Sequence, residues 1–104
     1  MRVTIIPTDG FVSINDANFS NLNLSFIDSN IHAVQWYETH GEIEYKDPVT
    51  NHMTENREIT SIDAFQPAID AWQIAKDVYD AAVAAAAAKA AVATPVGGAP
   101  NVIA

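Results

Sequence analysis

The stretch "HAVQWYETHGEIEY", residues 32–45, decides the fold because it predicts a β-hairpin with His40 and Gly41 near its tip. Side chains alternate between the two faces of a strand, so His32, Val34, Trp36 and Glu38 fall on one face. We expect that face to point inward at Val34 and Trp36. The return strand then brings Ile43 and Tyr45 beside them.

Short apolar runs on both sides of this hairpin extend it into a sheet. "RVTIIP" (residues 2–7) and "FVSIND" (residues 11–16) are separated by a Thr-Asp-Gly turn signal and predict an opening hairpin. Leu22, Leu24 and Phe26 have the period of a half-buried strand. After the Asp47-Pro48 turn, residues 57–59 predict a last short edge strand. Residues 1–60 therefore predict a small antiparallel β domain, a meander.

From Ser61 the apolar period changes from two to about 3.6, which predicts one long, alanine-rich, amphipathic helix over residues 61–93. Ser61 or Asp63 is expected to cap its first turn, and Pro67 suits the first position of the main helix. Thr94 and Pro95 end the helix, and residues 94–104 are expected to form a flexible tail. The predicted fold class is thus α+β.

The apolar arc of this helix is wider than the surface that one small sheet can cover. Its spacing of four and three matches the seam of a coiled coil, so we expect the helix to pack on the sheet and on a partner. The alternative is a solvated alanine helix that is stable through propensity alone. The residues of the seam are Phe65, Ile69, Trp72, Tyr79, Val83, Ala86 and Ala90.

Composition excludes several classes of function. The 104 residues carry a net charge of -8 and no cluster of Lys or Arg, which argues against nucleic acid and anionic membrane as partners. The chain has no cysteine, and its start lacks the features of a signal peptide, so we expect a soluble cytoplasmic protein. The alanine run is too weakly apolar to predict a membrane span.

No motif of catalysis or cofactor binding is present in the sequence. His32, His40 and His52 lack the spacing of a zinc site. Glu42 and Glu44 share a strand face that is expected to be solvated. We therefore predict no enzyme, no catalytic residue, no metal, no cofactor and no small-molecule substrate.

The two tryptophans allow two interpretations. In the first, Trp36 of the sheet and Trp72 of the helix are core residues packed against each other. In the second, one ring edge stays exposed and anchors a partner, as aromatic residues often do in interfaces.

The Trp-bearing hairpin "IHAVQWYETHGEIEY" followed by "ITSIDAFQPAIDAWQIAKDVYDAAVAAAAA" resembles the tail-fibre assembly proteins, or chaperones, of tailed bacteriophages. The resemblance covers roughly residues 31–93. It implies a viral protein that binds the C-terminal region of the tail-fibre protein, with three copies per fibre trimer, in the host cytoplasm during assembly. It also allows retention in the virion. The chain departs from the family in its short length, in having no second domain after the helix and in the ending "TPVGGAPNVIA".

On this resemblance, the hairpin is scaffold and docking surface, and the helix shields apolar fibre surface until the trimer closes. The expected partner-binding residues are Trp36, Tyr37, Phe65, Ile69, Trp72, Tyr79 and Val83. Two other functions stay open from the sequence. One is a permanent structural subunit of a phage tail or baseplate, and the other is a host adaptor module that self-associates through the helix.

Overall fold

The computed structural model describes residues 1–93, and the predicted flexible tail at 94–104 lies outside them. Six strands are followed by one long helix, which confirms the predicted α+β class. The elements are β1 (Arg2–Ile6), β2 (Phe11–Ile14), β3 (Ala17–Phe19), β4 (Ile31–Tyr37), β5 (His40–Lys46), β6 (Met53–Ile59) and α1 (Gln66–Ala93), with short 3-10 helices at Pro7–Asp9 and Asp63–Phe65.

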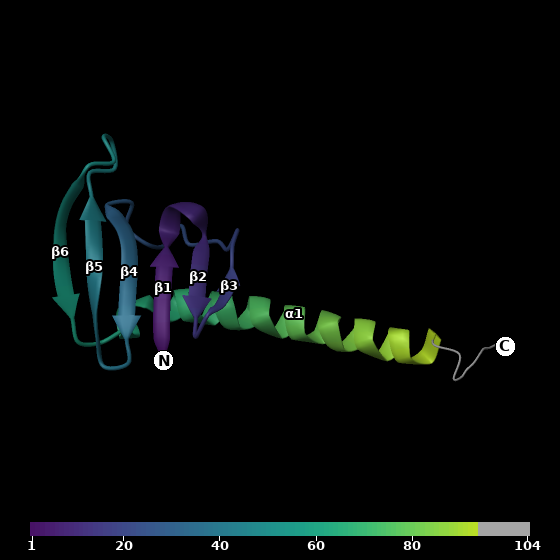
Figure 1. Cartoon of the computed structure of the whole chain (residues 1–104). Coiled ribbons are helices and arrows are strands. Elements are labelled where there is room, and N and C mark those ends of the chain that lie inside the picture. Colours follow the sequence, from purple (N-terminus) through teal and green to yellow (C-terminus); the bar gives the residue numbers. More distant parts are fainter. Residues whose placement is uncertain (94–104) are drawn as a thin grey trace. The chain divides into compact units, whose positions relative to one another are not determined.

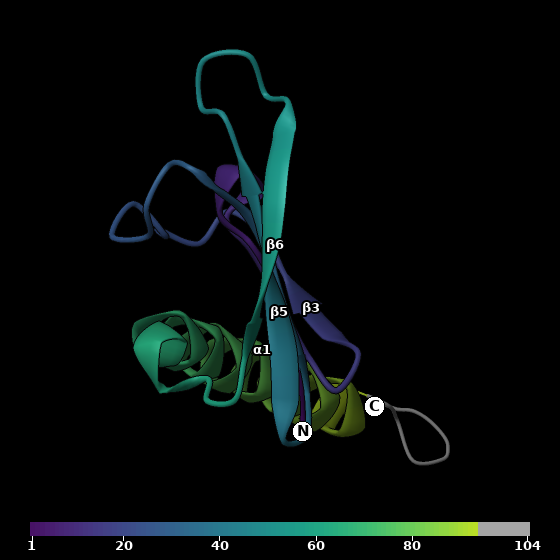
Figure 2. The same cartoon turned by 90° about the vertical axis from the view of Figure 1, so that its left-hand side faces the viewer.

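The strands form a single antiparallel sheet in the order β3-β2-β1-β4-β5-β6 (Figure 1). Both predicted hairpins are present, β1-β2 and β4-β5, and they meet where β1 pairs with β4. Residues 20–30 connect β3 on one side of β1 to β4 on the other. They lie on the same side of the sheet as the first turns of α1 (Figure 2).

The apolar core lies on this covered face of the sheet. Because directly opposed residues of paired strands share a face, the register aligns two rows of side chains across the sheet. The four largest side chains that are fully buried are Val3, Ile5, Val12 and Val34. Burial of each contributes about 1.5–3 kcal/mol. One row is Val12, Ile5, Val34 and Ile43, and the other is Ile14, Val3, Trp36 and Gly41.

The strand predicted over Leu22, Leu24 and Phe26 is wrong. The chain reverses earlier, at Asn15 and Asp16, whose φ angles of 49° and 70° suit the twist of a tight hairpin, and so the third strand is β3. The later residues form an irregular segment in which Leu24 is buried while Phe26 is exposed.

The predicted face of His32 is wrong, because β4 contains a β-bulge at this residue. The pairing steps from Ile31 opposite Tyr45 to Ala33 opposite Glu44, so His32 is the extra residue. His32 is half-buried, whereas both Ile31 and Ala33 are buried, so the strict alternation predicted from Val34 back to His32 does not hold. The edge strand predicted at residues 57–59 is present but longer, as β6.

The α-helix begins at Gln66, later than the predicted Ser61, after a 3-10 turn at Asp63–Phe65 whose N-cap residue, Ile62, makes no side-chain capping hydrogen bond. The hydroxyl oxygen of Ser61 accepts a hydrogen bond from the backbone N–H of Asp63 at 3.1 Å, and Pro67 is the second residue of α1. Residue contacts divide the chain into two units after Ile74. The first unit holds the sheet with the start of α1, and the described part of the second, from Ala75 to Ala93, is helix.

We predict that Gly41→Ala lowers the free energy of unfolding by about 1–3 kcal/mol or more, as overpacking does in a filled core. A Cβ at position 41 would collide with the backbone oxygen of Gln35 and would stand 2.9 Å from Cε3 of the Trp36 ring. Urea denaturation measures the change. An alanine variant as stable as the parent would contradict the close approach of Trp36 to Gly41.

Candidate partner-binding surface

Four of the seven predicted partner-binding residues lie in or against the core. Trp36, Phe65 and Trp72 are buried, and Ile69 is partly buried against the same cluster. Their apolar surface is largely covered by this chain itself. They therefore hold the start of α1 on the sheet, whatever further contacts a partner makes.

The indole of Trp72 attaches α1 to β3. Its Nε1–H donates a hydrogen bond to the backbone oxygen of Ala17 at 2.8 Å, and its ring meets the Phe19 ring edge-on with centroids 6.2 Å apart. Trp36 and Trp72 both belong to the buried core cluster, as the first interpretation predicts, and these contacts of the Trp72 indole are with β3, three strands away from β4. Sequence reasoning missed β3 because it assigned the third strand to residues 22–26.

Tyr37 lies exposed at the end of β4, beside the hairpin tip. The guanidinium of Arg2 lies 5.0 Å from the centre of the Tyr37 ring, and the His40 ring is 6.0 Å away on the other strand of the hairpin. Such cation–π contacts at exposed sites contribute about 0.5–1 kcal/mol. The tip is thus a small, ordered aromatic and cationic group that a partner can reach.

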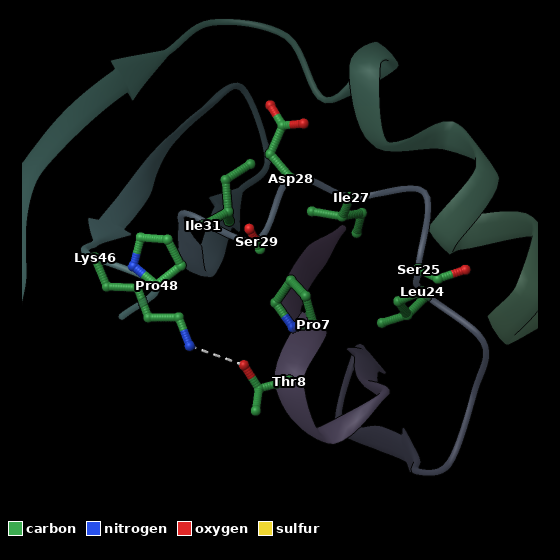
Figure 3. Close-up of a pocket in the computed structure, with 10 residues that line it drawn as sticks. All are labelled: Pro7, Thr8, Leu24, Ser25, Ile27, Asp28, Ser29, Ile31, Lys46 and Pro48. Carbon is green, nitrogen blue, oxygen red and sulfur yellow. Dashed lines mark hydrogen bonds between the residues drawn. The ribbon is translucent and has the colours of Figure 1, made fainter. Parts of the chain in front are cut away.

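A pocket of about 410 Å³ opens between the 20–30 segment and the end of β5 (Figure 3). Its walls are apolar at Pro7, Leu24, Ile27, Ile31 and Pro48. The ammonium group of Lys46 crosses one side and donates hydrogen bonds to the Thr8 hydroxyl at 3.0 Å and the Asn51 side-chain oxygen at 3.3 Å. The Asp28 carboxylate and the hydroxyl groups of Ser25 and Ser29 also line the pocket.

The described part of the second unit presents an exposed apolar stripe, which we define as Tyr79 and Val83. Their side chains are 58% and 50% exposed. All residues from Asp77 to Ala90 are exposed, and the ammonium group of Lys76 pairs with the Asp80 carboxylate at 2.8 Å one turn away. Tyr79 and Val83, two predicted partner-binding residues, therefore keep much of their apolar surface in water.

Neither a metal site nor a membrane-spanning helix is found among residues 1–93. They contain no group of three or more His, Cys, Asp or Glu side chains placed to hold a metal ion. Nor does this part of the chain include a helix long and apolar enough to cross a membrane. Comparison with protein-family models, with curated proteins and with solved structures found no match for this chain.

We predict that Trp72→Phe lowers the free energy of unfolding by about 1–3 kcal/mol, because the Ala17 carbonyl loses its indole donor while an aromatic ring is kept. Urea denaturation followed by circular dichroism measures the loss. Val78→Ala, at an exposed position of the same helix, serves as control and is expected to change stability by less than about 0.5 kcal/mol. Equal stability of the Trp72→Phe variant and the parent would show that the hydrogen bond does not hold α1.

Proposed function

We propose that this protein binds another protein chain through the exposed stripe of α1 and acts as a tail-fibre assembly chaperone. The observation that carries the proposal is the exposure of Tyr79 and Val83 within a stretch of helix that is exposed throughout. Exposed aromatic and branched side chains of this kind, grouped on one helix, are a common mark of a protein-binding surface.

The helix around the stripe is suited to close packing against another helix. Ten of the thirteen residues from Ala81 to Ala93 are alanine, and small side chains let two backbones approach each other. Tyr79 and Val83 are four residues apart and so lie one above the other on the helix surface. A partner that covers them gains up to about 1.5–3 kcal/mol for each large side chain it buries.

The negative charge of this protein indicates which kind of partner surface the helix favours. Asp80 lies on the helix next to the stripe, and the whole chain has a net charge of -8. Such a helix favours an apolar partner surface with neutral or basic surroundings over an acidic one. The resemblance to tail-fibre assembly proteins supplies a partner of the required kind, the C-terminal region of a fibre chain before its trimer closes.

In the proposed mechanism, three copies bind one fibre trimer in the host cytoplasm. The stripe covers apolar fibre surface that would otherwise aggregate while the chains assemble. The hairpin tip at Tyr37 and His40 gives a second contact. The chaperone can stay attached to the fibre in the virion.

The test is co-expression of the fibre protein with the double variant Tyr79→Asp/Val83→Asp. We expect the soluble fraction of fibre to fall to the level seen without chaperone, because two carboxylates replace the apolar contact. The variant itself should stay folded, since both side chains are at least half exposed and aspartate costs only about 0.7 kcal/mol per helix position.

Ala84→Asp/Ala88→Asp is the matched control. It adds the same two charges at the same spacing, but about 140° around the helix from Tyr79 and Val83. This control should support fibre solubility like the parent. Undiminished soluble fibre with the Tyr79→Asp/Val83→Asp variant, or equal loss with both double variants, would overturn the stripe as the binding surface.

A further inference from the structure

The last strand of the sheet, β6, presents a long open edge. β6 has seven residues and pairs only with β5 among the strands of residues 1–93, and its residues 53–58 are all exposed. The opposite edge strand, β3, has only three residues. Short edge strands resist pairing with other chains, whereas a seven-residue edge is a template for an added strand.

We infer that β6 pairs with β6 of a second copy of this chain, antiparallel, about a two-fold axis at Asn56. In this register Asn56 faces Asn56 of the second copy, and Glu55 faces Arg57 of the second copy. The symmetry repeats the second contact, so two Glu-Arg pairs flank a central pair of amides. The next pair outward, Thr54 opposite Glu58, carries no like-charge clash.

The charges of β6 favour this occupant. Edge strands are often protected by charges of one sign, which repel a second copy. β6 instead places Glu55 and Arg57 at equal distances on either side of Asn56, so the strand is complementary to itself when antiparallel. Opposite charges directly across an antiparallel pair stabilise it, and like charges destabilise it.

Glu55 and Arg57 are available for such a contact. Within one chain, the Arg57 guanidinium lies 3.4 Å from the Glu55 carboxylate, and both side chains are more than half exposed. The same guanidinium lies 5.4 Å from the centre of the Tyr45 ring on β5. This contact keeps the Arg57 side chain close to the sheet. Arg57 therefore stands near the open edge with its hydrogen-bonding capacity only partly used.

A single strand pair buries less surface than a standard protein interface, and each copy carries a net charge of -8. The dimer is accordingly weak and depends on concentration. It is tightened by salt that screens the overall repulsion.

The test is sedimentation velocity at physiological ionic strength over a concentration series of the full chain. The parent should show a monomer–dimer equilibrium. Arg57→Glu and Glu55→Arg, taken singly, each place like charges across both pairs and should weaken dimerisation about tenfold or more. The double variant Glu55→Arg/Arg57→Glu restores opposite charges and should recover the dimer, although it also lacks the Arg57 contact with Tyr45.

Mixing the two single variants gives the sharpest outcome. The carboxylates at positions 55 and 57 of the Arg57→Glu chain then face the guanidinium groups at positions 57 and 55 of the Glu55→Arg chain. Native mass spectrometry should find the mixed dimer in excess over either homodimer. A monomeric parent at every concentration, or single variants that dimerise like the parent, would overturn the inference.

This inference is independent of the proposed function, and a helix variant separates the two. Tyr79→Asp/Val83→Asp should dimerise like the parent. If that variant abolishes the dimer while Arg57→Glu does not, self-association runs through α1 and the β6 contact is wrong.

Discussion

The whole structure depends on two short segments that cover the apolar face of a six-stranded sheet. Val3, Ile5, Val12 and Val34 are fully buried, so this face has to be closed off from water. Among residues 1–93, two segments do so. One is the irregular stretch that places Leu24 in the core, and the other is the 3-10 turn with Phe65 followed by the start of α1 with Ala68 and Trp72. The hydrogen bond from Trp72 to Ala17 fixes where the second of these segments lies.

The part of the fold that could be predicted follows from local signals. The hairpins, the helix start at Pro67 and the inward faces of Val34 and Trp36 each depend on residues that are close in sequence. The wrong predictions occur where the local backbone conformation departs from what the hydrophobic pattern indicates. At Asn15 and Asp16, two positive φ angles turn the chain before the Leu22–Phe26 alternation begins, and at His32 one extra residue shifts the strand phase. Neither feature changes the hydrophobic period from which strands are predicted.

The candidate site was predictable only in part for a related reason. Periodicity groups Phe65, Trp72, Tyr79 and Val83 into one seam, but it cannot tell where the sheet stops covering that seam. The structure separates buried Phe65 and Trp72 from exposed Tyr79 and Val83. Packed first turns also remove the cost of helix nucleation, so the alanine-rich part continues as helix through propensity and needs no packing of its own. An exposed helix of this kind remains available to bind.

Symmetry connects the two proposed surfaces. A β6 pair is a two-fold contact in which the same patch serves both copies, so it closes at two chains and cannot join three around a fibre axis. A fibre trimer with three bound copies would therefore leave three β6 edges unpaired, or would join a second trimer through them to give six copies on two fibres. Because the proposed β6 contact is weak and the stripe lies on a different element, a dimer through β6 and the proposed binding of a partner through α1 would not compete for the same surface.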